Sequence, residues 1–304
     1  MELKKYLKEI TTYDEFDDFF ADGEVHQEVD LDLLCTDLIL NPPMEQEYTV
    51  YIPSKGRPTT GSTYLLCKNA GIPYKVVCEP QDFEAYSAEI GADNLVMLDK
   101  NDQGIQYARS FIKKYSTELG QEKHWQMDDD MKYFTTRVNE KNVRTDILAV
   151  VSIVEAITKL YSNVGISGIT SNAFAFSKPR KVQANRLAYG VVLVNNEIEQ
   201  FWRPDTVEDW DYTLNMLEAG YCTLAFNHVN FVTPGTGTNA GGNQMTDWET
   251  KEKRKEFYTK FAAMWPDNFE CRPIKNDKTS KGYKLHHKSR FFQKYDQKLE
   301  LIEY

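Results

Sequence analysis

The chain has 304 residues, a length that fits one large α/β domain or two domains of about 150 residues. Aromatic residues make up 13% of it, which excludes a wholly disordered chain. No run of about 18 apolar residues is present, so we expect no membrane span and no membrane partner. The first 20 residues hold six acids and no apolar segment, and the five cysteines are dispersed. We therefore expect no secretory signal, reduced thiols and a cytoplasmic protein, with neither a disulfide framework nor a zinc site.

Charge is unevenly distributed along the chain, whose net charge is −10. Residues 1–48 carry 3 lysines and arginines against 14 acidic residues, a net charge of −11. Residues 251–304 carry 14 lysines and arginines against 8 acidic residues, a net charge of +6. An acidic protein is not expected to coat nucleic acid, but a basic end permits a local contact with a polyanion.

Residues 1–47 are predicted to form an acidic N-terminal appendage with weak helical periodicity. From residue 48 onward, strands and helices alternate, which predicts βαβ units and a mixed, mainly parallel sheet flanked by helices. The predicted strands are 48–52, 74–78, 94–98 and 124–127, and the helices between them are 59–70, 82–90 and 104–119. Such a sheet binds ligands at the carboxyl ends of its strands, where both the turn 53–58 and the acidic run 128–130 fall.

The rest of the chain is less regular. We expect a long apolar helix at 144–161, followed by strands at 164–176 and 187–194, the second of which leads into an Asn195-Asn196 hairpin turn. A further helix is expected at 205–219 and a last strand region at 221–232. Residues 220–246 contain no charged residue and end in a glycine-rich loop. Residues 247–304 are predicted to form a helical and basic C-terminal extension, which leaves 48–246 as the central domain.

Three consecutive aspartates, Asp128 to Asp130, follow the fourth predicted strand. Adjacent carboxylates repel one another, and placing them where a buried strand ends is costly unless a cation neutralises them. In an extended backbone Asp128 and Asp130 point to the same side, where they can hold Mn²⁺ or Mg²⁺. The alternative is an acidic surface turn.

The first predicted strand ends in Tyr51-Ile52-Pro53-Ser54-Lys55-Gly56-Arg57-Pro58, which is neither a P-loop nor a GxGxxG turn. Lys55 and Arg57 can contact a diphosphate from this position. The alternative is a proline-bounded turn with solvated cations.

A second acidic motif, Asp205 to Tyr212, opens the predicted helix 205–219. Asp205 as N-cap with Glu208 three residues later forms a capping box, which explains Glu208 but neither Asp209 nor Asp211. A carboxylate near a helix N-terminus stays ionised at neutral pH, so either aspartate can serve as a general base. The predicted buried stripe of this helix is Val207, Trp210, Leu214 and Leu217.

Two further features, His228 and the basic C-terminal tail, can be either structural or functional. His228, beside the last strand, is either a hydrogen-bonded core residue or a metal ligand. The basic tail is either a solvated face or a phosphate-binding surface; its candidate contacts are Lys281, Lys284, Lys288 and Arg290, interleaved with Tyr283, Phe291, Phe292 and Tyr295.

Together, the strand ending in Ile-Pro-Ser-Lys-Gly-Arg, the strand ending in Asp-Asp-Asp and the helix with Glu-Asp-Trp-Asp resemble a known family. The sequence is similar to GT-A fold nucleotide-sugar glycosyltransferases, and within them to the TET/JBP-associated glycosyltransferases, found largely in bacteriophages. Those enzymes add sugars to hydroxymethylated pyrimidines in DNA. The resemblance covers about residues 48–246.

The resemblance implies a GT-A (Rossmann-like) fold and a role for each acidic motif. Asp128 and Asp130 would hold the metal and the ribose-diphosphate of the donor, with Asp129 beside them and His228 completing the metal shell. Asp209, in the pair Glu208-Asp209, would be the base, and Asp211 is the alternative. The residues that would frame the nucleotide are Pro53, Ser54, Lys55 and Arg57.

The function implied is a metal-dependent, inverting transfer of glucose or arabinose from a UDP-sugar to 5-hydroxymethylcytosine. The acceptor would be double-stranded phage DNA in the host cytoplasm. The alternatives are the same chemistry on a glycan or protein acceptor, and a nucleotide-binding module without catalysis.

Overall fold

The computed structural model describes residues 29–175, 178, 180–234, 250–275, 277, 281–288 and 291–302. Its strands are β1 (Val50–Pro53), β2 (Tyr74–Cys78), β3 (Leu95–Met97), β4 (Lys123–Met127), β5 (Tyr133–Val138), β6 (Lys141–Thr145), β7 (Val164–Ser171), β8 (Val182–Ala184), β9 (Val191–Asn195), β10 (Cys222–Val232), β11 (Phe269–Pro273) and β12 (Tyr283–His287). Its α-helices are α3 (Leu31–Leu40), α4 (Thr63–Ala70), α5 (Phe83–Ile90), α6 (Ile105–Glu118), α7 (Ile147–Thr158), α8 (Asn172–Ala175), α9 (Glu208–Glu218) and α10 (Lys251–Met264). Short 3₁₀ turns occur at Pro80–Asp82, Ala92–Asn94 and Phe291–Lys294. None of the helices in these ranges is long and apolar enough to cross a membrane.

One large sheet organises the described chain. Its strand order is β3-β2-β1-β4-β9-β7-β10-β5-β6, and β8 also pairs with β10. The pairs β1–β2, β2–β3, β1–β4 and β7–β10 are parallel, whereas β9 runs antiparallel between β4 and β7. The predicted α/β class, a mixed sheet flanked by helices as in the GT-A fold, is confirmed.

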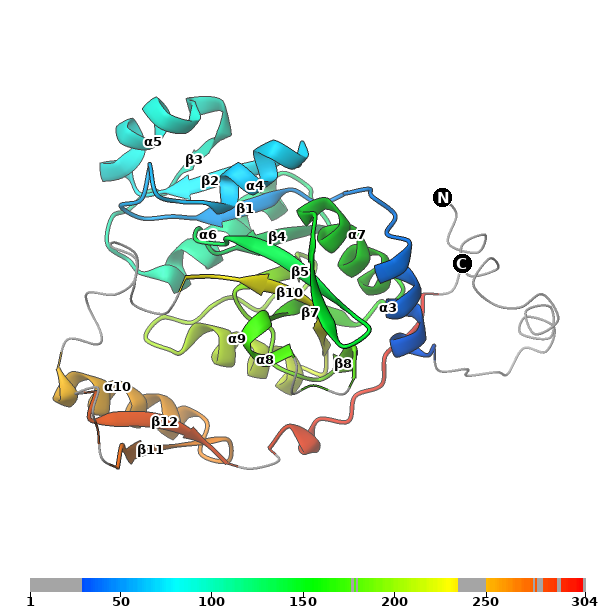
Figure 1. Ribbon diagram of the computed structural model, residues 1–304. Coiled ribbons are helices and arrows are strands. Elements are labelled where there is room, and N and C mark those ends of the chain that lie inside the picture. Colours follow the sequence, from blue (N-terminus) through cyan, green and yellow to red (C-terminus); the bar gives the residue numbers. More distant parts are fainter. Residues whose placement is uncertain are drawn as a thin grey trace.

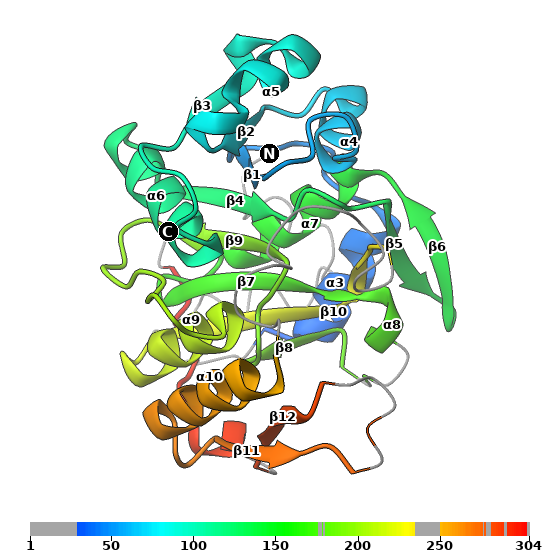
Figure 2. The ribbon, with the colours of Figure 1, turned by 90° about the vertical axis from the view of Figure 1, so that its left-hand side faces the viewer.

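Helices cover both faces of this sheet (Figures 1 and 2). In Figure 2, α6 and α9 lie on one side, and α4, α7 and α3 lie on the other. Alternate residues of β1 show the two faces, because Tyr51 packs with α6 while Val50 and Ile52 belong to the cluster on the opposite side. A strand buried on both faces reads as a continuous apolar run, which is why residues 48–52 lack polar alternation.

The two ends of the chain pack onto this framework by different contacts. In α3, Leu34, Cys35 and Leu38 are buried in the core cluster that contains α7. The predicted periodicity at residues 6–20 lies outside the described residues. The C-terminal extension contains α10 and also a two-stranded sheet, β11–β12, which a helical interpretation missed. It packs on α9 through one apolar cluster, formed by Leu214, Leu217, Phe261, Phe269 and Tyr295.

Two predictions about the middle of the chain are wrong. The helix predicted at 144–161 begins at Ile147, and a hairpin of β5 and β6 precedes it. Asn195-Asn196 is not a hairpin turn, because β9 pairs with the earlier strands β4 and β7. The Asn196 side chain is buried and bonds back to His124 and to the carbonyl of Gln121.

A buried histidine lies in the middle of β4. The Nδ1 atom of His124 is 2.8 Å from Oδ1 of Asn196, and its Nε2 atom is 2.9 Å from the amide nitrogen of Gln126. That amide also donates to the carbonyl of Arg109 at 3.1 Å, so Nε2 accepts from it and Nδ1 carries the proton. Both ring nitrogens are satisfied only in the neutral form, and burial lowers the pKa of His124 to about 3.

Acid should therefore destabilise the fold through His124. An unfolded histidine takes up a proton near pH 6.5, whereas folded His124 stays neutral until about pH 3, so the free energy of unfolding falls as pH decreases through this window. The steepest contribution is about 1.4 kcal/mol per pH unit. We expect His124→Gln to lose this part of the pH dependence when urea unfolding is measured between pH 7 and pH 4. Parallel pH profiles for the two proteins would contradict the neutral assignment.

Candidate active site

The carboxyl ends of β1 and β4 form the centre of the candidate site. From β1 the chain crosses to β2 on one side, and β4 lies on the other side of β1. Ligands of open α/β sheets bind at such a reversal of strand order. The turn 54–57 follows β1 and the aspartates 128–130 follow β4, so the sheet brings the two sequence motifs together, as the periodicity predicts.

Asp129 joins these two motifs. Its carboxylate accepts from the Ser54 hydroxyl at 2.5 Å and from Nη1 of Arg57 at 2.6 Å. The Tyr86 hydroxyl completes the contact, since it lies 2.6 Å from Ser54 Oγ and accepts from the Arg57 backbone N–H. Only 8% of the Asp129 side chain is exposed. The hydrogen bonds of Asp129 and Ser54 thus hold the loop after β1 in place.

The backbone of the aspartate run is a turn and not extended, which corrects the prediction that alternate carboxylates share one side. The start of α4 holds this turn. The backbone N–H groups of Ser62 and Thr63 donate to the carbonyl of Asp129, and the Thr63 hydroxyl donates to the carbonyl of Asp128. Asp128 and Asp130 remain the more open members, with 42% and 25% of their side chains exposed.

Asp128 pairs with a buried arginine from α6. Nη2 of Arg109 lies 2.8 Å from Oδ1 of Asp128, and the Arg109 side chain is 2% exposed. Partial removal from water, reinforced by the nearby carboxylates of Glu208, Asp130 and Asp129, raises the pKa of Asp128 to about 6, against the attraction of Arg109.

Arg109 also faces the start of α9. Burial, and then the carboxylates of Glu208 and Asp128, raise the pKa of Asp209 well above its usual value. Arg109 and a hydrogen bond with the backbone of Gly190 act in the opposite direction. These surroundings act against the helix N-terminus, which the sequence analysis expected to keep Asp209 ionised, so the charge state of Asp209 at neutral pH stays a prediction.

Gly190 fits tightly between the two motifs. Its carbonyl accepts from the Asp128 N–H at 3.0 Å, and its φ of 69° is in the left-handed region. A Cβ atom here would lie 3.1 Å from the ring of Phe231 and 3.7 Å from Oδ2 of Asp128. Glycine therefore lets the backbone reach both Asp128 and Asp209.

Asp211 has a different environment from Asp209. It is fully buried and accepts from Nε of Arg203 at 2.9 Å, from a second Arg203 nitrogen, and from the indole N–H of Trp265 at 2.9 Å. These bonds tie α9 to the C-terminal extension. The capping box is also wrong: Val207 occupies the N-cap without a side-chain bond, and Asp205 has a φ of 55° before it.

The remaining predicted donor residues lie at the same edge. Pro53 ends β1 and is buried. Lys55 pairs with Asp102 at 2.5 Å and with Glu79 at 3.1 Å, so its ammonium is engaged by the loops after β2 and β3. Contact of Lys55 or Arg57 with a diphosphate stays a prediction.

His228 lies away from this group. It precedes Val229, which is opposite Thr136 in the β5–β10 pair, and its Nε2 is 3.4 Å from the carbonyl of Lys178. Burial lowers the pKa of His228, and the charges of Lys181 and Arg137 act in the same direction. Within the described ranges, no three histidine, cysteine or acidic side chains are grouped as a metal site. Asp128 and Asp130 nevertheless offer the hard oxygen ligands that Mg²⁺ and Mn²⁺ take, which are commonly one or two carboxylates plus phosphate oxygens.

The lysines and the aromatic residues of the basic tail have different surroundings. Lys281, Lys284 and Lys288 are exposed, whereas Phe292 stacks near Trp210 on α9, with ring centroids 5.9 Å apart. Arg290 lies outside the described residues, and the side chain of Phe291 does too. A role of the three lysines in acceptor binding stays a prediction.

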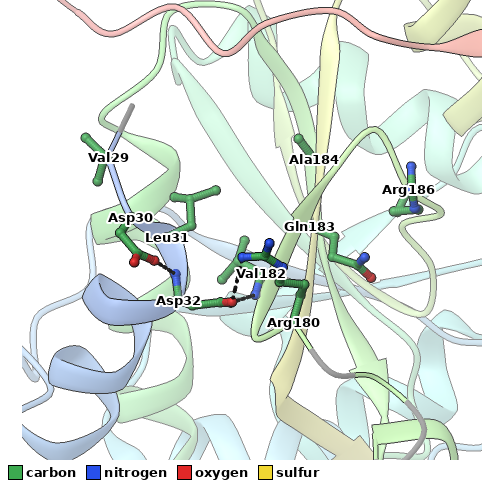
Figure 3. Close-up of a pocket in the computed structure, with 9 residues that line it drawn as sticks. All are labelled: Val29, Asp30, Leu31, Asp32, Arg180, Val182, Gln183, Ala184 and Arg186. Atoms are coloured by element: carbon green, nitrogen blue, oxygen red, sulfur yellow. Dashed lines mark hydrogen bonds and ion pairs between the residues drawn. The ribbon is translucent and has the colours of Figure 1, made fainter. Parts of the chain in front are cut away.

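A hollow of about 480 Å³ lies elsewhere, between α3 and β8 (Figure 3). Asp32 projects across it to Arg180 at 3.2 Å and accepts from the N–H of Lys181. Strand β8, which lines this hollow, pairs with residues 224–226 near the start of β10. The turn that contains Asp128 lies near Val232, at the opposite end of β10. This hollow is therefore separate from the acidic site.

Comparison with known families identifies the chain. The family model described as TET-Associated Glycosyltransferase matches residues 48–242, which include the turn after β1, both acidic motifs and the three arginines that pair with their aspartates. The chain belongs to this family. No curated protein matches it. The described sheet edge is thus the candidate active site of a glycosyltransferase.

Sequence reasoning missed Arg109 of this glycosyltransferase, although a signal was present. Arg109 lies four residues after Ile105 and three before Ile112, so it falls on the apolar face of its helix. A cation within a buried stripe requires a buried anion nearby. The acidic motifs supply that anion.

The adjacent aspartates should differ in their effect on stability. Asp129→Asn leaves the Arg57 charge without its closest buried partner, so we expect a loss of about 3 kcal/mol and a melting temperature lower by several degrees. Asp130→Asn is the matched control; its carboxylate is 3.9 Å from Arg57 and more exposed, and the loss should stay below about 1 kcal/mol. Equal losses in thermal unfolding would contradict the role assigned to Asp129.

Proposed function

We propose that this glycosyltransferase moves glucose or arabinose from a UDP-sugar to 5-hydroxymethylcytosine in double-stranded phage DNA, with inversion at the anomeric carbon. One observation carries the proposal: Asp128, at the end of a parallel strand, and Asp209, at the start of α9, face the same buried arginine. This proximity supports a donor-binding role for Asp128 and the role of base for Asp209. The family membership and the resemblance of the three motifs support the acceptor class.

The charge balance at this edge favours a bound divalent cation. Among its described residues, the cations Lys55, Arg57 and Arg109 each already pair with a carboxylate. The carboxylates that surround them are more numerous: Glu79, Asp102, Asp128, Asp129, Asp130, Glu208 and Asp209. A diphosphate brought to this edge adds further negative charge, so its binding requires positive charge from outside the chain.

Asp128 and Asp130 would hold Mn²⁺ or Mg²⁺ together with oxygens of the donor diphosphate. When bound, the metal would offset the negative charge that develops on the leaving UDP. The bonds of Asp129 to Ser54 and Arg57 would keep the nucleotide-framing loop in place. His228 is less suited as a further ligand, because the positive charges of Lys181 and Arg137 already act on it.

Asp209 would act as the base. It would take the proton of the hydroxymethyl group, whose oxygen then forms a bond to the anomeric carbon from the face opposite the diphosphate. The bond from that carbon to the diphosphate oxygen breaks, and its electron pair leaves with UDP. The contact with Gly190 and the rigid start of α9 would hold the carboxylate in position for this transfer.

Mass spectrometry tests the reaction directly. A hydroxymethylated duplex incubated with the protein, Mn²⁺ and a panel of UDP-sugars should gain the mass of one hexose or pentose per modified base. A duplex with unmodified cytosine is the control and should gain nothing. Transfer to a glycan or protein acceptor in place of DNA would favour the alternative acceptor, and the absence of UDP release with every acceptor would favour a binding module.

Substitution separates the two candidate bases. Asp209→Asn should leave UDP-sugar affinity near normal and lower turnover by roughly 10²–10⁴-fold, the usual contribution of a positioned base. Asp211→Asn should mainly lower the melting temperature, because it leaves Arg203 and the Trp265 indole without their buried acceptor. Steady-state kinetics and thermal unfolding of both variants provide the comparison. A folded Asp211→Asn protein with the larger loss of turnover would move the base to Asp211.

A further inference from the structure

The middle of the chain carries a basic surface that the donor site does not use. Residues 131–196 hold nine lysines and arginines against three acidic residues, a net charge of +6, in a chain whose net charge is −10. Residues 197–250, which follow, hold one arginine against nine acidic residues. The positive charge is therefore concentrated and not spread over the domain.

The fold gathers part of this charge on the β5–β6 hairpin. Lys141 and Arg144 are exposed on β6, and the guanidinium of Arg144 lies 5.0 Å from the centre of the Tyr133 ring. Near the hairpin tip, Arg137 pairs with Glu140 at 2.5 Å, and the charges of Arg137 and Lys181 both act on Glu140. Cations of two segments distant in sequence thus lie around one ribbon.

The hairpin has the form of a projecting two-stranded ribbon (Figure 2). Among the described strands, β6 pairs with β5 alone and forms the edge of the sheet. Residues 133–136 of β5 pair with β10, whereas the described pairing of residues 137 and 138, near the tip, is with β6. At the base, the Lys132 N–H donates to the carbonyl of Val232, two residues after Asp130. The ribbon therefore leads directly away from the candidate active site.

We propose that the β5–β6 hairpin binds the phosphate backbone of duplex DNA, with Lys141 and Arg144 as its main contacts, and so aligns the acceptor with the active site. This inference rests on the proposed function. An acidic protein must approach a polyanion through its basic surface, and a two-stranded ribbon has the width that the major groove admits. Tyr133, stacked with Arg144, adds an aromatic face next to the cations.

The C-terminal tail is a weaker candidate for this role. Two of its residues are engaged by α9: the ring of Phe292 packs near Trp210, and Lys294 pairs with Glu218 at 2.8 Å. Lys281 and Lys284 are exposed and provide the competing surface. A test must therefore compare the two surfaces at equal change in net charge.

Three double variants of the full chain make this comparison. Lys141→Glu with Arg144→Glu tests the hairpin, Lys281→Glu with Lys284→Glu tests the tail, and Lys68→Glu with Lys114→Glu is the control on α4 and α6. Each changes the net charge by the same amount, so long-range repulsion is matched. The measurement is the fluorescence anisotropy of a labelled hydroxymethylated duplex over a series of KCl concentrations.

The hairpin variant should bind more weakly, and the slope of log affinity against log salt should become less steep by about 2, since each lost phosphate contact removes about 0.9. The control and tail variants should keep the slope of the unchanged protein. The milder pair Lys141→Gln with Arg144→Gln should flatten the slope by a similar amount, and equal melting temperatures would show that folding is intact.

The outcomes distinguish this inference from the proposed function. If the unchanged protein transfers sugar to DNA but both hairpin variants keep its salt slope, the hairpin assignment is wrong and the function stands. If the tail variant alone flattens the slope, the acceptor binds the C-terminal extension. If the unchanged protein neither modifies DNA nor binds it in a salt-dependent way, the proposed function itself fails.

Discussion

The guanidinium of Arg109 lies buried where the ends of two acidic motifs meet, and the site depends on this placement. Asp128 and Asp209 are both partly withdrawn from water next to other carboxylates, and without a cation between them their repulsion would oppose the approach of α9 to β4. Arg109 is held in turn by both ends of the Gln126 amide, which also contacts His124. The hydrogen bonds of His124 and Gln126 in β4 therefore help to hold the charged side chain of Arg109, from α6, at the edge of the sheet.

Arginine–carboxylate pairs also separate the aspartates of the acidic motifs into buried, paired members and more open ones. Arg57 engages Asp129 and Arg203 engages Asp211, and both of these aspartates are nearly inaccessible to solvent. Asp128, Asp130 and Asp209 keep more exposure or fewer bonds. Adjacent residues of one type therefore have different tasks, because a turn or a helix start directs their side chains to different partners. In the proposed site, this division would let some carboxylates hold the loops in place while others bind a ligand.

Much of the first half of the fold follows from sequence periodicity, and β2 has the predicted bounds because its apolar run is flanked by turn residues. The hairpin of β5 and β6 was missed because its exposed strand is polar, and the apolar run after it suggested a single longer helix. The positions of the motifs at strand ends were predictable. The roles of Asp129, Asp211 and Arg109 were not, since each depends on a partner 8 to 75 residues away that only the fold brings into contact.

The distribution of charge also constrains how the two proposed anionic substrates could meet on this protein. Inside the candidate site, the cations are committed to carboxylates, so they hold the site together and leave little positive charge for a diphosphate. Outside it, Lys141 and Arg144 face solvent on a ribbon that starts three residues after Asp130. A DNA duplex that reached the acidic edge without such a contact would be repelled by it. The proposed separation of a basic acceptor surface from an acidic donor site that would hold a metal ion would remove this conflict, because each anion would be neutralised by a different source of positive charge.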